Sequence, residues 1–222
     1  MSADGELVLL DFPMSPFCMR VGVALAEKGL KYESRPENNL LGGKSELLLA
    51  SNPIYKKVPV LLHNGKPLCE STIIVGYIDE TWPSPPLMGS SPLERAEARF
   101  WADFVDKKLF DAGAAIWRAK ADELEVVKRD FLDVVRQLEG ALGEKDFFGG
   151  KVFGFVDIIT IGVTSWFPAY EKYGGFQLED HCPKFAAWMK RCKGRESVAK
   201  VIPDAPQICE FVGMLRKMMG IE

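Results

Sequence analysis

The spacing of apolar residues changes once along the chain, and this change limits the folds that the sequence can adopt. Up to about residue 80, short apolar runs alternate with stretches of helical period. Beyond residue 93, every apolar stripe has helical spacing. A stretch rich in proline, glycine and serine lies between them and is typical of a linker. The sequence therefore predicts an α/β domain over residues 1–83, a linker over 84–92 and an all-α domain over 93–222.

The first domain is predicted to have the element order β-α-β, a connecting segment, and β-β-α. The run Leu7–Leu10 is typical of a central strand that is buried on both faces. Asn64-Gly65 is the pair favoured in a two-residue hairpin turn. The expected strands are 7–10, 32–35, 58–62 and 67–69, and the expected helices are 15–28 and 71–82. This order matches a thioredoxin-like fold.

The second domain carries four stripes with helical spacing, and we expect most of their residues in a helical core. The stripes are Leu93, Ala96, Phe100 and Phe104; Leu124, Val127, Phe131, Val134, Leu138 and Leu142; Phe185, Trp188 and Met189; and Ile208, Phe211, Leu215 and Met218. Phe100, Trp101 and Phe104 are expected either in this core or at a contact between two copies of the chain. Strand-like alternation does not occur here, so an all-α bundle is predicted.

Composition and missing motifs exclude several classes of protein. The 222 residues include 28 basic and 31 acidic side chains without a basic face or tail, so neither a nucleic-acid nor a membrane partner is expected. Five cysteines without a CxxC pair, and a start of the chain unlike a signal peptide, predict a reducing, cytoplasmic compartment. His63 and His181 lack a second histidine at ligand spacing, and no glycine-rich nucleotide motif occurs. Neither a metal site nor a cofactor is predicted.

Short motifs in a fixed order extend over nearly the whole chain. In the first half they are Ser15-Pro16-Phe17-Cys18, NPIYKKVPV over 52–60, HNGKP over 63–67, Glu70-Ser71 and YIDETW over 77–82. In the second half they are FVDI over 155–158 and SWFP over 165–168. In this order, the motifs make the chain resemble a plant tau-class glutathione transferase. The resemblance implies a thioredoxin-like domain followed by an all-helical domain, glutathione as co-substrate, and a homodimer.

Ser15 lies where the first strand passes into the first helix. The resemblance implies that its hydroxyl activates the thiol of glutathione, which must lose its proton before it attacks an electrophile. A hydroxyl donor and the N-terminal end of a helix both favour a thiolate. Alternatively, Ser15 only caps the helix, as serine often does. Cys18 is interpreted as a structural, partly buried thiol, although its place in the first helical turn could lower its pKa.

The resemblance assigns the cysteinyl and γ-glutamyl parts of glutathione to two short segments. The backbone of Val58, before a Pro59 that follows a cis bond in this family, would pair with the cysteinyl unit as an added strand. Glu70 would hold the γ-glutamyl ammonium group, and Ser71 the neighbouring carboxylate. From residue type alone, Pro59 could instead be an edge proline, and Glu70-Ser71 a solvated acid and a helix cap.

Lys44 would pair with the glycine carboxylate of glutathione by its position in the family. Lys56 and Lys57 are nearby alternatives for this contact. From residue type alone, each of these lysines could simply be solvated.

An apolar pocket for the electrophile is expected between the domains. Its lining residues, given by the resemblance, are Phe17, Trp117, Arg118, Trp166 and Phe211. The aromatic residues among them could equally belong to the core. Asp157, three residues after Gly154, is interpreted as part of a helix N-terminal cap.

The resemblance and these residues together imply three candidate functions. The first is conjugation of glutathione to hydrophobic electrophiles, together with the reduction of organic hydroperoxides that some family members catalyse. The second is a non-catalytic carrier of hydrophobic ligands or glutathione conjugates. The third is a thiol-disulfide oxidoreductase that uses Cys18, which Ser15 disfavours because it replaces the nucleophilic cysteine of a CPFC motif.

Overall fold

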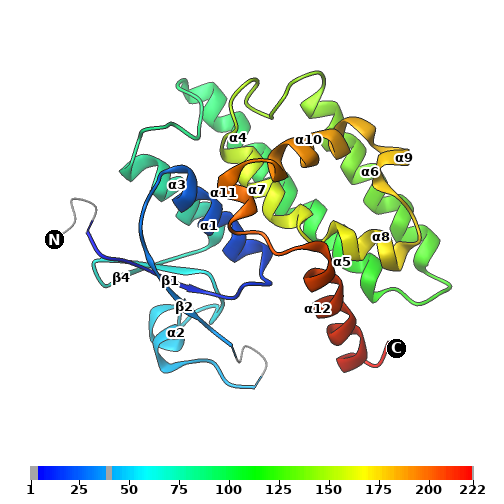
Figure 1. The fold of residues 1–222 in the computed structure, drawn as a ribbon, viewed down its shortest axis with the longest axis horizontal. Coiled ribbons are helices and arrows are strands. Elements are labelled where there is room, and N and C mark those ends of the chain that lie inside the picture. The colour runs from blue at the N-terminus through cyan, green and yellow to red at the C-terminus, as the bar shows by residue number, and fades with distance from the viewer. Residues whose placement is uncertain (1–4, 39–41, 222) are drawn as a thin grey trace. The chain divides into compact units, whose positions relative to one another are not determined.

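The computed structural model describes residues 5–38 and 42–221. The chain divides into two compact units, Met1–Leu87 and Met88–Glu222, at a point within the range 84–92 that the sequence indicates as a linker. Residues 1–4 and 222, the outer ends of the two predicted domains, lie outside the described residues. The first unit combines a sheet with helices and the second is helical (Figure 1), which confirms the predicted fold class.

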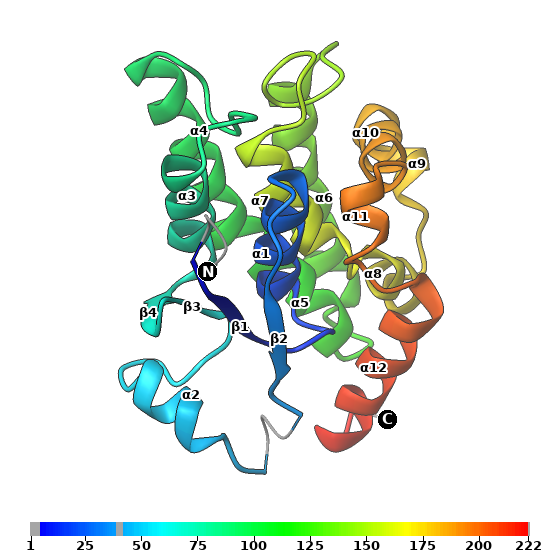
Figure 2. The ribbon, with the colours of Figure 1, turned by 60° about the vertical axis from the view of Figure 1, so that its left-hand side comes forward.

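The first unit contains a four-stranded sheet with the strand order β2-β1-β3-β4. β1 pairs in parallel with β2 and antiparallel with β3, and β3 pairs antiparallel with β4. The strands are β1 (Leu7–Asp11), β2 (Glu33–Pro36), β3 (Val60–His63) and β4 (Lys66–Cys69). α1 (Pro16–Glu27) and α3 (Ser71–Thr81) lie on one side of the sheet, and α2 (Glu46–Ser51) lies on the other (Figures 1 and 2).

β1 is central because its side chains are apolar on both faces. Val8 and Leu10 belong to a core cluster with Leu48 of α2. Since side chains alternate along a strand, Leu7 and Leu9 are buried on the opposite face. The continuous apolar run therefore predicted this strand correctly.

The predicted hairpin turn of the first unit is confirmed, whereas its short helix α2 was not predicted from the sequence. Asn64 and Gly65 have φ angles of 51° and 74° between β3 and β4, as the favoured two-residue turn requires. The connecting segment contains α2, which has only six residues. A helix this short shows no clear period. Its visible signal is Ser45, whose Oγ accepts a hydrogen bond from the Leu48 N–H at 3.0 Å.

Helices make up nearly all of the second unit. α4 continues through a π-helical turn, η1, into α5, and α7 is buried at every one of its ten residues. The elements are α4 (Pro92–Phe104), η1 (Val105–Leu109), α5 (Phe110–Arg118), α6 (Leu124–Leu142), α7 (Phe155–Thr164), α8 (Phe167–Gly174), α9 (Leu178–His181), α10 (Pro183–Lys193), α11 (Glu196–Ala199) and α12 (Ala205–Met218).

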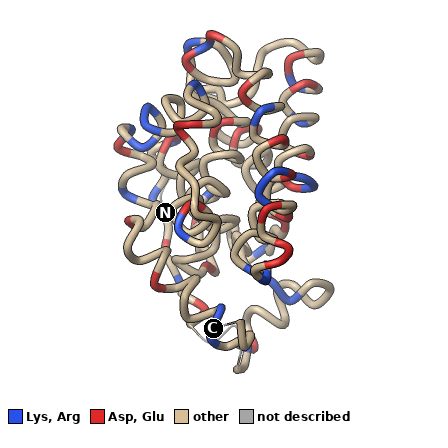
Figure 3. The backbone as a smooth tube through the Cα atoms, turned by 90° about the vertical axis from the view of Figure 1, so that its right-hand side faces the viewer, with Lys and Arg blue, Asp and Glu red and all other residues tan. Residues whose placement is uncertain are grey.

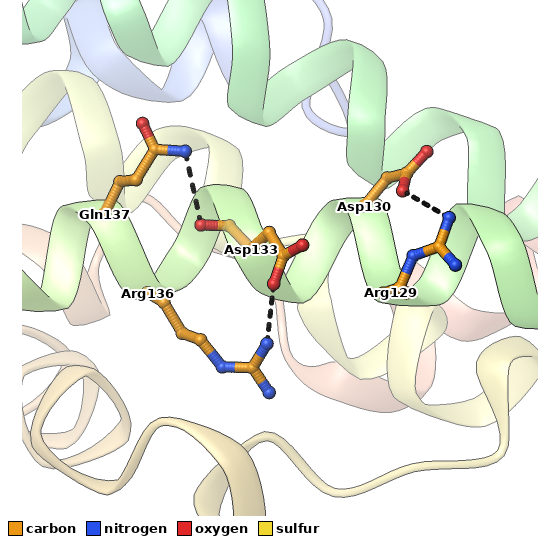
Figure 4. Close-up of polar contacts among 5 residues, drawn as sticks. All are labelled: Arg129, Asp130, Asp133, Arg136 and Gln137. Carbon is orange, nitrogen blue, oxygen red and sulfur yellow. Dashed lines mark hydrogen bonds and ion pairs between the residues drawn. The ribbon is translucent and has the colours of Figure 1, made fainter.

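Charged residues of both signs are interspersed along the chain (Figure 3), and α6 illustrates how they pair. On its exposed side, Arg136 Nη1 lies 2.7 Å from Asp133 Oδ1, and Arg129 Nη2 lies 3.4 Å from Asp130 Oδ1 (Figure 4). Gln137 Nε2 donates to the Asp133 carbonyl at 3.5 Å. Water screens such pairs, so they contribute little to stability. They keep this face of α6 solvated.

Some residues expected in the helical core are exposed instead. Leu93 on α4 is 69% exposed, and Ala96 on the same stripe is also exposed. Phe100 is 61% exposed, so of its two expected places only the contact between two copies of the chain stays a prediction. At the end of α12, Met218 is exposed as well. Helical spacing identifies an apolar face of a helix, but it does not show whether another element of the same chain covers that face.

Asp157 forms the predicted cap at the start of α7. Its Oδ2 accepts from the Gly154 N–H at 3.0 Å. Its Oδ1 accepts from the Phe148 N–H at 3.0 Å and from Trp188 Nε1 at 2.8 Å. Burial raises the pKa of Asp157 to about 6, although these hydrogen bonds lower it.

Gly113 allows α5 to approach α8 closely. A Cβ atom at this position would lie 2.3 Å from Cε2 of Tyr170, far inside normal packing distance. Tyr170 is completely buried, so its ring cannot move aside. A glycine is therefore required where these helices meet.

Candidate active site

One edge of the sheet gathers most of the residues predicted for glutathione binding. In the strand register, Leu10 lies opposite Val60, and Val60 lies opposite Cys69. The chain after β1, before β3 and after β4 therefore leaves the sheet at the same edge. Ser15, Val58-Pro59 and Glu70-Ser71 follow or precede these strand ends.

Ser15 is the N-cap of α1. Its N–H donates to the Phe12 carbonyl at 2.9 Å, and its Oγ accepts from the Cys18 N–H at 3.3 Å. The capping role expected as an alternative is therefore present. It does not exclude thiol activation, because a hydroxyl can accept one hydrogen bond and donate another.

Cys18 is a buried thiol, only 5% exposed. Its Sγ accepts from the Phe12 N–H at 3.3 Å. Burial raises the pKa of Cys18 to about 12, and the hydrogen bonds with Ser15 and Phe12 oppose this only in part. The expectation that the first helical turn lowers this pKa is therefore wrong, because desolvation of a thiolate outweighs the helix start. The burial agrees with a structural role.

The Val58-Pro59 peptide bond is cis, as the resemblance implies. Pro59 is buried, and Val58 packs against the core cluster on the α2 side of the sheet. The chain just before this bond is held by Asn52, whose Nδ2 donates to the Lys57 carbonyl at 3.0 Å. These contacts fix the backbone at the edge where Ser15 lies.

Glu70 and Ser71 lie at the start of α3. Glu70 is exposed and has a φ of 70°, a conformation that residues with a side chain seldom adopt. Ser71 is buried, and its Oγ accepts from Arg20 Nη1 at 3.1 Å. As the first residue of α3, Ser71 also offers a backbone N–H that no residue of the helix can accept.

Arg20 is a residue that the sequence analysis missed. It is fully buried on α1, with its Cζ 5.0 Å from the ring centroid of Phe17 and its Nη1 bonded to Ser71. Its signal in the sequence is a single charge within an otherwise apolar helical run. The guanidinium adds positive charge beside the start of α3, where an anion would also meet the helix N-terminus.

Two of the three candidate lysines lie together. Lys44 Nζ donates to the Lys56 carbonyl at 2.6 Å, and Lys56 itself has a φ of 54°. Lys57 is exposed and next to Val58. The lysines thus flank the two ends of α2.

Four of the five predicted pocket residues form a cluster in the second unit. The ring centroids of Trp117 and Trp166 are 6.1 Å apart, and those of Trp166 and Phe211 are 5.9 Å apart. Arg118 Cζ lies 4.7 Å from the centroid of the Trp117 ring. The two tryptophans are buried and Phe211 is half-buried. Phe17 belongs to the first unit, where it contacts Arg20.

Neither a metal cluster nor a membrane helix is present in the part of the chain that the structure describes. No group of three or more His, Cys, Asp or Glu side chains there could hold a metal ion. No helix over residues 5–38 and 42–221 combines the length and the apolar character needed to span a bilayer. All five cysteines are free.

Comparison with known proteins gives consistent matches over the whole chain. Residues 5–80 match the family model "Glutathione S-transferase, N-terminal domain", and residues 94–196 match "Glutathione S-transferase, C-terminal domain". A probable glutathione S-transferase, parC, of Nicotiana tabacum is 55% identical over 99% of this chain and 100% of its own length.

Two solved structures are also similar. Rice GST1, crystallised in complex with glutathione, is 44% identical with a TM-score of 0.92, over 98% of this chain and 99% of the rice chain. A tau-class glutathione S-transferase from mango, Mangifera indica, is 37% identical with a TM-score of 0.90, over 96% and 100% of the two chains.

Proposed function

Since the chain belongs to the glutathione S-transferase family and to its tau class, we propose that it transfers the thiolate of glutathione to hydrophobic electrophiles. The observation that carries this proposal is the position of Ser15. Ser15 is the N-cap of α1, and it lies at the edge of the sheet where Val58-Pro59 and Glu70-Ser71 also lie.

Ser15 activates the thiol in two ways. Its hydroxyl donates to the sulfur while its oxygen still caps the helix, and the N-terminal end of α1 adds favourable partial charge. Environments of this kind lower the pKa of a thiol to about 3.5–7.5. The bound glutathione is then a thiolate near neutral pH and a strong nucleophile.

The rest of glutathione is held by charge and backbone contacts. Glu70 binds the γ-glutamyl ammonium group, and the Ser71 N–H and hydroxyl bind the neighbouring carboxylate, with Arg20 behind Ser71. The Val58 backbone pairs with the cysteinyl unit as an added strand. Lys44 binds the glycine carboxylate.

The electrophile contacts the aromatic cluster of the second unit. Trp117, Trp166 and Phe211 provide apolar surface and Arg118 provides a polar anchor. In the first unit, Phe17 lies two residues after Ser15, the residue proposed to activate the thiol. Apart from glutathione as co-substrate, the reaction needs no cofactor. The same thiolate would also attack organic hydroperoxides. We place the protein in the cytoplasm, where five unpaired cysteines would stay reduced.

Binding of hydrophobic ligands without turnover is the second candidate function, because the same aromatic cluster would serve it. The placement of Ser15 at the sheet edge favours catalysis over binding alone. A disulfide exchange function of Cys18 is disfavoured by the burial of its sulfur and by its raised pKa.

A homodimer is also proposed, and the exposed stripe on α4 supports it. Leu93, Ala96 and Phe100 form an apolar face that the described residues of one chain leave uncovered. Apolar faces of this kind are commonly covered by a partner.

The decisive experiment compares Ser15→Ala with the wild type. We expect glutathione binding to persist, the thiolate absorbance of the complex near neutral pH to disappear, and kcat/KM for an aryl halide to fall about 10²-fold. Ser90→Ala, at an exposed serine outside the predicted site, is the control. Unchanged turnover in Ser15→Ala would exclude Ser15 as the activating group.

A further inference from the structure

Glu37 is a buried acid that follows β2 directly. It is 8% exposed, and its N–H donates to the Asp11 carbonyl at the end of β1, at 2.7 Å. Its Oε2 accepts from the Ser45 N–H at 3.2 Å, and its Oε1 accepts from the Ser45 hydroxyl. A buried carboxylate is costly unless hydrogen bonds compensate it, and here both oxygens bind one residue.

Ser45 connects Glu37 to the lysine proposed for the glycine carboxylate. Ser45 is the N-cap of α2 through its bond from the Leu48 N–H. It also follows Lys44 directly, so the Glu37–Ser45 contacts fix the backbone from which the Lys44 side chain extends. At its other end, Lys44 donates to the Lys56 carbonyl.

We propose that Glu37 is a positioning residue, which acts through Ser45 to hold Lys44 where it can bind the glycine carboxylate of glutathione. This inference rests on the proposed function. A lysine side chain loses conformational entropy when it is ordered. A fixed backbone next to Lys44 leaves less freedom to lose when glutathione binds.

The geometry also distinguishes Glu37 from a direct ligand of glutathione. Its two oxygens are occupied by Ser45, and its negative charge would repel a carboxylate. Its effect must therefore be indirect and limited to the glycine end of the ligand. The cysteinyl and γ-glutamyl contacts depend on Val58, Glu70 and Ser71, which lie in other segments.

The test uses titration calorimetry with two ligands, glutathione and its glycyl monoethyl ester, which lacks the charge that Lys44 would bind. A hydrogen bond between charged groups is stronger than one between neutral groups, so its partial loss is measurable in the Kd. A partial loss of it should raise the Kd of glutathione about five- to tenfold in Glu37→Ala. The Kd of the ester, which is already weaker in the wild type, should change less than about twofold.

Three further variants define the pathway. Glu37→Gln keeps the size of the side chain and one acceptor, so it should fold and show a smaller effect in the same direction. Ser45→Ala should also raise the Kd of glutathione more than the Kd of the ester. When Glu37→Ala is added to Lys44→Ala, the Kd of glutathione should not rise further, because the lysine that Glu37 positions is already absent. Glu33→Ala, which removes an exposed acid paired with Arg35 on β2, is the matched control and should leave both Kd values unchanged.

Equal weakening of both ligands in a folded Glu37→Gln variant would overturn the inference, because it would indicate a general structural role. Unchanged binding of glutathione would also overturn it. Equal Kd values of the two ligands in the wild type would overturn it as well, since the glycine carboxylate would then have no contact that Glu37 could support. Because the titration does not require turnover, a failure of the proposed catalytic function would be seen separately, in the Ser15→Ala assay.

Discussion

Lys28 and Asp79 form a buried ion pair in which Nζ lies 2.7 Å from Oδ1, with side chains 0% and 12% exposed. The same Asp79 oxygen accepts from the Leu87 N–H at 2.8 Å, and Lys28 also donates to the Pro85 carbonyl. This pair therefore attaches residues 85–87 to the ends of α1 and α3. The stretch that the sequence indicates as a linker is in part a fixed segment of the first unit.

We expect Lys28→Met to lower the free energy of unfolding by about 3 kcal/mol, because it leaves the Asp79 carboxylate buried without its cation. Urea denaturation would measure this. The control Lys31→Met, at an exposed lysine, should change it by less than about 0.5 kcal/mol. A double variant, Lys28→Met with Asp79→Leu, should recover part of the loss. If Lys28→Met and Lys31→Met lowered the free energy of unfolding equally, the Lys28–Asp79 ion pair would not stabilise the protein.

The five cysteines should differ in their reactivity towards iodoacetamide at pH 7.5. Cys69 and Cys209 are partly exposed, so they should be alkylated first. Cys18, Cys182 and Cys192 are buried, and burial raises the pKa of Cys18 to about 12 and that of Cys182 to about 11. They should react only after unfolding in urea. Peptide mass spectrometry over a time course would measure the order, and early labelling of Cys18 would show that its thiolate is accessible.

Asp157 should make the protein less stable as pH rises from about 4 to 6. The pKa of an unfolded aspartate is about 3.9, whereas burial raises that of folded Asp157 to about 6. Between these values the folded chain binds more protons, so its free energy of unfolding falls with rising pH, by up to about 3 kcal/mol from this group. Asp157→Asn removes this titration.

Urea denaturation of both proteins from pH 4 to pH 7.5 would isolate the effect of Asp157. The stability advantage of the wild type over Asp157→Asn should shrink across this range. A constant difference between the two proteins would show that Asp157 titrates near the same pH in both states. A growing advantage would show that its three hydrogen bonds outweigh burial.

The proposed dimer contact can be tested at α4. Phe100→Asp places a charge in the exposed apolar stripe and should reduce the mass in solution from that of a dimer to 24.8 kDa. Light scattering after gel filtration would measure it. Val126→Asp, at an exposed apolar residue of α6, is the matched control and should remain a dimer. If Phe100→Asp also remained dimeric, the contact would lie elsewhere.

The sequence predicted the elements whose signals are local. Leu7–Leu10 indicated a central strand because both faces of a strand must be apolar to be buried on both sides. Asn64-Gly65 indicated the turn because few other residues accept positive φ at two successive positions. Gly154 and Asp157 indicated a cap because their spacing matches the N-cap and third helical positions.

The elements that the sequence did not predict depend on contacts between distant residues. Arg20 and Ser71 are 51 residues apart, and only the packing of α1 against α3 brings them together. The pKa of Cys18 follows from burial, which the motif around it does not show. The exposed face of α4 has the same pattern as a covered one, since a pattern of spacing says nothing about neighbours.

The arrangement of the aromatic cluster depends on Gly113, where α5 and α8 approach each other closely. Trp117 is one turn further along α5, and Trp166 immediately precedes α8, so the spacing of their rings depends on how closely these two helices approach each other. A single methyl group at position 113 would act as a wedge. The shape of the surface that we propose for the electrophile thus depends in part on a residue that faces Tyr170 rather than these rings.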